Sequence, residues 1–151
     1  MKIAIASDHG GFALKTALIA PLTEIGLVKD FGPSSSESCD YPDYAGKVAL
    51  EVASGGADFG VLICRSGVGM AMAANRYQGV RAAICSTTDG ATLSRQHNGA
   101  NVLCMGQMIW GDMMAVAAAD AFLDTKFTEG LEGLAPFLHE AAKKVEAIDG
   151  R

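Results

Sequence analysis

Short apolar runs alternate with longer stretches of helical periodicity along the chain, and this alternation restricts the possible fold more than any other feature. The runs that we expect to form strands are residues 3–7, 27–31, 59–64, 81–85 and 101–105. The spacing of apolar residues predicts helices over 12–25, 41–53, 68–76, 89–97, 112–123 and 134–148. Strands that alternate with helices form a parallel sheet with right-handed connections. We therefore expect an α/β fold: a Rossmann-like, doubly wound, five-stranded parallel sheet with helices on both faces and an extra C-terminal helix.

Composition sets the class of protein. We expect a single domain over residues 1–151, with 125–151 as a tail that contacts another subunit, because a chain that is 50% hydrophobic and 19% charged needs further surface to bury. A net charge of −5 without a basic stripe argues against nucleic-acid binding. No apolar run approaches the length of a membrane span, and the start of the chain resembles a strand more than a signal peptide. These features predict a cytoplasmic protein.

The four cysteines, Cys39, Cys64, Cys85 and Cys104, have no CxxC spacing. In a chain without a secretion signal they are expected to be reduced thiols. A thiol-redox function is disfavoured because Cys64 has no second cysteine nearby in sequence. No two histidines have metal-ligand spacing, so we expect no metal. We expect no organic cofactor either, because proton transfer beside a carbonyl needs only a positioned base and oxyanion donors.

The strand 59–64 ends in Cys64, and the turn that follows opens a helix. This turn consists of Arg65, Ser66, Gly67, Val68 and Gly69. A turn of this kind points backbone N–H groups and the positive end of a helix dipole at one place. It binds anions and favours the thiolate form of a cysteine placed there. The turn is neither GxGxxG nor GxxxxGKS, so no dinucleotide or P-loop motif is present. Cys64 could act as a base that removes a proton beside a carbonyl, and the turn could stabilise the anion that results.

Each candidate residue also has a purely structural interpretation. Asp8 can cap the helix that follows it. Cys64 can be a buried core thiol, as free cysteines often are. His97 can be a cation at the C-terminal end of a helix, and Tyr41 can be a packing residue at a helix start.

Several segments occur in a fixed order and spacing over roughly the first 125 residues of the chain. They are Ser7–Gly11, Asp40–Ala45, Ile63–Cys64 with Ser66–Gly69, Ala73–Arg76, Gly79–Ala83, and Ser94–Asn98 with Asn101–Leu103. Together they resemble the family of ribose-5-phosphate isomerase B and the galactose-6-phosphate isomerase subunits. No single motif identifies the family, but six motifs in the same order and spacing are a specific signal.

The resemblance implies catalytic roles for three residues. Cys64 matches the cysteine base that moves a proton between C1 and C2 of the sugar. His97 matches the histidine that helps to open the sugar ring. Asp8 matches a group that assists proton movement at the sugar oxygens.

The resemblance also implies substrate contacts. Asn98 and the turn from Arg65 to Gly69 would hold the developing enediolate. Tyr41 and His9 would line the site, with His9 near the phosphate.

The implied function is an aldose–ketose isomerase of sugar phosphates that acts through an enediolate, with ribose 5-phosphate to ribulose 5-phosphate in the pentose phosphate pathway as the expected reaction. The expected assembly is a homodimer or homotetramer. One alternative is an isomerase of a different phosphorylated or unphosphorylated sugar. Another, from a different class, is a non-catalytic module that binds a sugar or a nucleotide.

The chain departs from the family pattern where that pattern binds phosphate. Family members usually carry an arginine shortly after the fifth strand, and this chain has Met108 after Gly106 and Gln107. They also carry two arginines in the C-terminal tail, whereas residues 129–135 here contain two glutamates and no arginine. Arg65 replaces a residue that is usually glycine. The departures leave the choice of sugar, and whether it is phosphorylated, open.

Overall fold

The computed structural model describes residues 1–148. One all-parallel sheet contains five strands, β1 (Lys2–Ser7), β2 (Leu27–Asp30), β3 (Phe59–Cys64), β4 (Ala82–Ile84) and β5 (Val102–Gly106). Their order is β2-β1-β3-β5-β4. From β1 the chain goes outward to β2 and then crosses to β3; on that side it passes to the edge strand β4 before it returns to β5, which lies between β3 and β4. Strands are thus added on both sides of the β1–β3 pair, which confirms the doubly wound α/β fold. In such sheets ligands bind outside the carboxyl ends of the strands, where the winding reverses.

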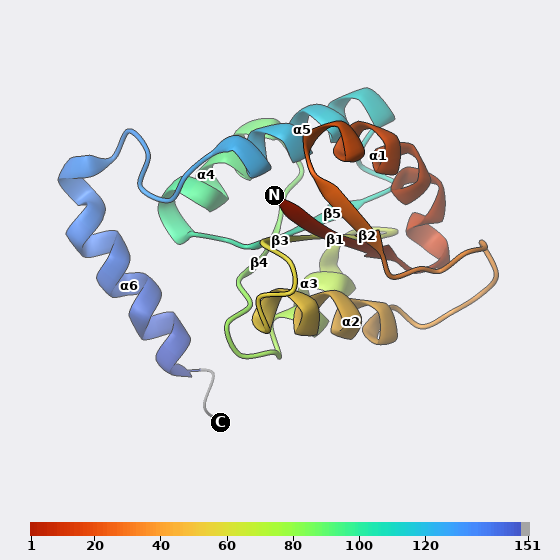
Figure 1. Cartoon of the computed structure of the whole chain (residues 1–151), viewed down its shortest axis with the longest axis horizontal. Coiled ribbons are helices and arrows are strands. Elements are labelled where there is room, and N and C mark those ends of the chain that lie inside the picture. Colours follow the sequence, from red (N-terminus) through yellow and green to blue (C-terminus); the bar gives the residue numbers. More distant parts are fainter. Residues whose placement is uncertain (149–151) are drawn as a thin grey trace.

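Helices cover both faces of the sheet (Figure 1). On one face lie α1 (Phe12–Ile25), α4 (Thr88–Asn98) and α5 (Asp112–Asp124). On the other face lie α2 (Tyr41–Ala53) and α3 (Val68–Ala74). The chain also has the short 3-10 turns η1 (His9–Gly11) and η2 (Glu132–Leu134), followed by the C-terminal helix α6 (Ala135–Ile148).

Two hydrophobic cores result from the alternation of side chains along each strand. In β1, Ile3 and Ile5 pack with α1 and α5, whereas Ala4 and Ala6 face α2 and α3. The same alternation puts Ile63 in the first core and Cys64 in the second. Cys64 therefore ends its strand on the side of α2 and α3.

The predicted elements agree closely with the structure, and the bounds of 12–25, 41–53 and 59–64 are exact. The fourth strand is shorter than predicted. Arg81 falls outside it because its backbone N–H donates to the Asn101 Oδ1 at 2.8 Å rather than to a neighbouring strand. The final helix begins at Ala135 because η2 precedes it.

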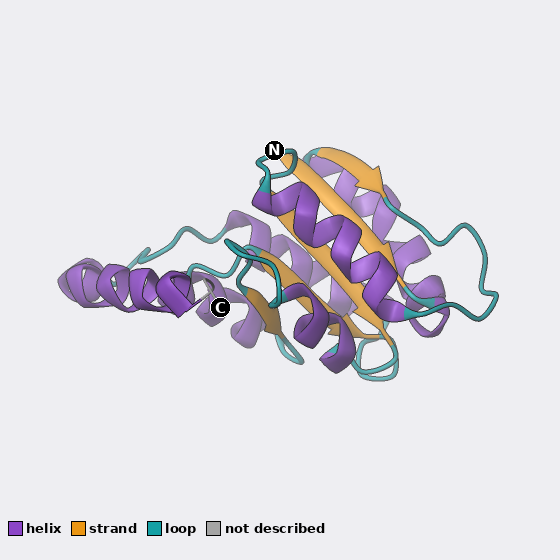
Figure 2. Ribbon diagram, turned by 90° about the horizontal axis from the view of Figure 1, so that it is seen from below, coloured by secondary structure: helices purple, strands orange, loops and turns teal. Residues whose placement is uncertain are grey.

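Helix α6 stands apart from the body of the molecule (Figure 2). Leu138 is the one residue of α6 that is buried, and Phe137 is 72% exposed. The Arg81 Nη1 forms an ion pair with the Glu146 Oε1 at 2.7 Å. The rings of His139 and Phe127 meet edge to face, with their centroids 4.6 Å apart. Helix α6 leaves apolar side chains exposed in the single chain. Within residues 1–148, no helix combines the length and the apolar character that a membrane span requires.

Candidate active site

Asp8 and Cys64 lie next to each other at the carboxyl edge of the sheet. Strands β1 and β3 pair in register up to Ser7 and Ile63, and the Asp8 backbone N–H donates to the Ile63 carbonyl at 3.1 Å. The Asp8 Oδ1 accepts the backbone N–H of Gly11 at 3.0 Å, which confirms the predicted capping role. Asp8 is only 8% exposed, so a carboxylate is held at the edge of the core beside the thiol.

Cys64 is anchored by the turn that follows it. The Gly67 backbone N–H donates to the Cys64 Sγ at 3.1 Å. Gly67 has φ = 84°, a conformation that glycine adopts without strain, and this conformation turns the N–H back toward the sulfur. A hydrogen bond from an amide to sulfur stabilises the thiolate more than the thiol. The turn thus fixes the position of the sulfur at the end of the strand.

The turn after β5 holds the Cys64 loop from the other side. The backbone N–H of Gln107 donates to the Cys64 carbonyl at 2.9 Å, and that of Met108 donates to the Arg65 carbonyl at 3.1 Å. The Gln107 Oε1 also accepts the backbone N–H of Leu14 in the first turn of α1, at 3.0 Å. Gln107 therefore links three elements around Cys64. The sequence analysis did not identify this role, because a glutamine after a strand carries no motif.

Two further predicted residues reach the same edge. The His9 Nδ1 lies 3.0 Å from the Cys39 carbonyl oxygen and 3.3 Å from the Cys39 backbone nitrogen, so it joins the loops that follow β1 and β2. Tyr41 lies over Gly69, where an added Cβ would come within 3.0 Å of the tyrosine ring. Tyr41, the first residue of α2, and His9, the first residue of η1, thus lie on elements that border the Cys64 turn.

A buried lysine orders the loop that carries Cys39. The Lys15 Nζ donates to both carboxylate oxygens of Asp30, at 2.9 and 2.7 Å, and to the Pro33 carbonyl at 2.8 Å. The Lys15 side chain is only 1% exposed. A charge buried to this extent needs partners, and Asp30 and Pro33 provide them. The sequence analysis missed it, although a lysine on the apolar face of Leu14, Leu18 and Leu22 was a usable signal.

The structure does not bring His97 and Asn98 to Cys64 within one chain. Both lie at the C-terminal end of α4, just before β5 begins, and so at the amino edge of the sheet. Cys64 pairs with Gly106 at the far end of β5, about 13 Å along the strand from its start. His97 and Asn98 instead line a groove of about 460 Å³, whose other wall is the α6 residues Ala141, Ala142, Val145 and Ile148.

The remaining thiols differ from Cys64 in their surroundings. Burial raises the pKa of the Cys104 thiol well above its usual value, and the nearby Cys64 and Cys85 act in the same direction. Burial also raises the pKa of Cys85, partly offset by its hydrogen bond with Ser94. Cys39 is partly exposed, whereas the other three thiols are buried. Within the described part of the chain, no group of His, Cys, Asp and Glu side chains could hold a metal ion.

Comparison with known proteins assigns the family. Residues 3–134 match the model of the ribose/galactose isomerase family. The chain is 48% identical over 130 residues to ribose-5-phosphate isomerase B of Escherichia coli, a match that covers 85% of this chain and 87% of that protein.

Solved structures agree. Ribose-5-phosphate isomerase B of Clostridium thermocellum has a TM-score of 0.91 at 40% identity, covering 99% of this chain and 97% of that one. The Mycoplasma genitalium enzyme, solved with bound ribulose-5-phosphate, has a TM-score of 0.89 at 37% identity, covering 98% and 95%. The chain belongs to the ribose/galactose isomerase family.

Proposed function

We propose that this protein is an aldose–ketose isomerase that interconverts ribose 5-phosphate and ribulose 5-phosphate. The observation that carries the proposal is the Cys64 thiol, which accepts an amide N–H from Gly67 and lies beside the Asp8 carboxylate, in a chain of this family. A positioned base and a set of oxyanion donors are the two requirements of the reaction, and each is worth about 10²- to 10⁴-fold in rate.

Cys64 is the proposed base. Its thiolate removes the proton from C2 of the open-chain aldose, which leaves an enediolate across C1 and C2. The same thiol then returns the proton to C1 and the ketose results. No redox partner is needed, because one carbon is oxidised as the other is reduced within the same molecule.

Asp8 is proposed to manage the protons on the sugar oxygens. Its Oδ1 is used by Gly11, and its Oδ2 forms no hydrogen bond with residues 1–148. The second oxygen can therefore exchange a proton with O1 or O2 of the enediolate. Its position next to Cys64 places both groups on the same end of the substrate.

His97 and Asn98 can serve this site only in a second copy of the chain. We propose a homodimer in which His97 of the partner subunit opens the sugar ring and Asn98 of the partner subunit holds the enediolate at Cys64. Support comes from the apolar groove beside His97 and from exposed apolar side chains on α3, the helix that follows the Cys64 turn, such as Met72, which is 68% exposed. We assign residues 125–148 to a tail that contacts the other subunit; residues 149–151 of the expected tail lie outside the described residues.

The reaction is tested with ribose 5-phosphate in deuterated water. We expect conversion to ribulose 5-phosphate with solvent deuterium at C1, detected by NMR, because a single thiol exchanges its proton with solvent during the transfer. Binding of the sugar phosphate without conversion and without deuterium incorporation would instead identify a non-catalytic binding module.

The shared site is tested by mixing two inactive variants. Cys64→Ala and His97→Ala homodimers should each be inactive, and after subunit exchange the mixture should recover about a quarter of wild-type activity, since half of the dimers then hold one intact site. A mixture that stays inactive although mass spectrometry shows mixed dimers would refute the shared site and leave the isomerase proposal standing.

A further inference from the structure

We infer that Arg65 binds the phosphate of the substrate and is the residue that makes this enzyme prefer phosphorylated sugars. The inference deepens the proposed function and rests on it, because it concerns the far end of the same substrate. It depends on where the positive charges of the described residues lie.

The loops at the carboxyl edge of the sheet contain very little positive charge. Five connections leave this edge, namely residues 8–11, 31–40, 65–67, 85–87 and 107–111, and all lie within the described residues. Their basic residues are His9 and Arg65, against the carboxylates Asp8, Glu37 and Asp40. A doubly charged phosphate bound at this edge needs a cation to compensate it, and Arg65 is the one permanent cation on these loops.

The backbone of Arg65 is held firmly while its side chain is exposed. Its carbonyl accepts the Met108 N–H at 3.1 Å. On the other side, a Cβ added to Gly10 would lie 3.4 Å from both the nitrogen and the Cβ of Arg65, so the two loops are in contact. The side chain therefore starts from a fixed point one residue beyond Cys64, between the loops that follow β1 and β5.

The guanidinium of Arg65 is available for a ligand. It forms no ion pair and no hydrogen bond with any residue from 1 to 148. Its nearest carboxylate by loop contact, Asp8, is buried and already caps Gly11. Two cations of the body differ from Arg65 in this respect: Lys15 is paired with Asp30, and Arg95 donates to the carbonyls of Thr125 and Ala100.

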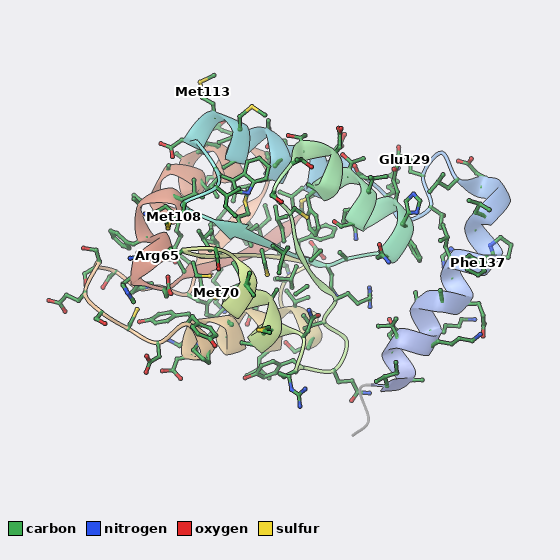
Figure 3. The ribbon with its side chains drawn as sticks, turned by 180° about the vertical axis from the view of Figure 1, so that it is seen from behind. Arg65, Met70, Met108, Met113, Glu129 and Phe137 are labelled. Carbon is green, nitrogen blue, oxygen red and sulfur yellow. The ribbon has the colours of Figure 1, made fainter. Side chains whose placement is uncertain are left out.

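The described residues around Arg65 add no second positive charge that could bind a phosphate. Met108 beside it is 75% exposed and carries no charge (Figure 3). Glu129 lies at the opposite end of the molecule in the same view, next to α4. That turn is attached to the end of α4 by the Gln96 Nε2, which donates to the Glu129 carbonyl at 3.1 Å. If the partner subunit supplies the end of α4 to the site, the turn that carries Glu129 comes with it and adds a negative charge. Arg65 then remains the residue that can bind the phosphate.

The test compares the wild type with Arg65→Ala, Arg65→Lys and the control Lys2→Ala. The control removes the same charge from an exposed position at the start of β1, at the opposite edge of the sheet. Two readouts are used: KM and kcat for ribose 5-phosphate, and the concentration of inorganic phosphate that protects Cys64 from alkylation by iodoacetamide. The second readout does not require turnover.

We expect Arg65→Ala to raise KM and the protecting phosphate concentration by about 10- to 150-fold, the worth of one charge-assisted contact, with kcat little changed. Arg65→Lys should recover part of the loss, because an ammonium keeps the charge without the planar fork. Lys2→Ala should behave as wild type.

The inference is overturned if Arg65→Ala leaves both readouts unchanged, or if the wild type isomerises free ribose as well as ribose 5-phosphate. Failure of the proposed function has a different signature: no conversion of ribose 5-phosphate by the wild type. Loss of phosphate protection in Arg65→Ala would then still identify Arg65 as the anion contact.

Discussion

At the scale of single residues, position rather than exposure distinguishes Cys64 from the buried thiol of Cys104. Cys64 and Cys104 are both nearly inaccessible, at 5% and 0%. Cys104 lies in the middle of β5, whereas Cys64 ends β3 and receives an amide hydrogen bond. Cys104 therefore belongs to the interior of the sheet, whereas Cys64 reaches its carboxyl edge, where ligands bind in sheets of this type.

Replacing Cys64 by alanine should therefore abolish turnover, with a loss of about 10²-fold or more in kcat, while the fold and sugar-phosphate binding persist. Alkylation of wild-type Cys64 should inactivate the enzyme, and substrate should slow it. Cys85→Ala, another buried thiol, is the matched control and should retain turnover. Near-normal kcat in Cys64→Ala would remove this residue as the base.

The buried thiols predict how stability depends on pH. The pKa values of Cys85 and Cys104 are raised by burial from an ordinary value near 9. Above pH 9 the unfolded chain therefore releases these protons before the folded chain does, and the free energy of unfolding should fall as pH rises. Urea unfolding on either side of pH 9 measures the slope. Cys104→Ala should flatten it, and an unchanged slope in that variant would contradict the assignment.

At the scale of elements, the sequence predicted the sheet because each strand is a continuous apolar run, and it predicted the cluster of Asp8, His9, Tyr41 and Cys64 because these residues follow strands or begin helices at one edge. The sequence motif around His97 does not say at which edge of the sheet this residue lies. The place of His97 in the chain does say so, because residues between a helix and the next strand lie at the amino edge. The role of Gln107 could not be predicted for a different reason: it depends on a hydrogen bond with Leu14, which is distant in the sequence.

The Gly67 turn can be tested by itself. Gly67→Ala should cost about 1–2 kcal/mol of stability, because φ = 84° is unfavourable for alanine, and its Cβ would lie 3.1 Å from the Met105 backbone. It should also lower kcat, because the N–H can no longer meet the sulfur. Gly55→Ala is the matched control: φ is 77°, and nothing lies within 4 Å of the added Cβ.

Unfolding curves and kcat are measured for both variants. Gly55→Ala should be destabilised with an unchanged kcat. Equal kcat for the two variants would show that the Gly67 amide does not contribute to the chemistry.

At the scale of the whole molecule, the most unusual feature is an apolar helix outside the body. Its exposed apolar side chains are Phe137, Val145 and Ile148, preceded by Leu134 in η2. A chain that is 50% hydrophobic gains stability when these exposed apolar side chains are covered. A second copy of the chain offers apolar surface for this purpose, both in the groove beside His97 and on the helix that follows the Cys64 turn.

Phe137→Asp should therefore convert the proposed homodimer into a folded monomer of 15.6 kDa with little activity. The reason is that Phe137, 72% exposed in the single chain, would place a charge in the interface. Lys144→Ala, which changes an exposed polar residue of the same helix, should remain dimeric. Light scattering measures both masses, and a Phe137→Asp variant that stays dimeric would exclude this face from the contact.

The separation of His97 from Cys64 across the sheet has a kinetic consequence. Under the proposed assembly, a newly made chain has half of a site at each end and cannot isomerise sugar until it meets another copy. Specific activity should then fall on dilution below the dissociation constant of the dimer, and initial rates should rise with the square of the chain concentration in that range. Fresh synthesis at low abundance would yield inert molecules, so the output of the enzyme would respond more steeply than in proportion to its amount.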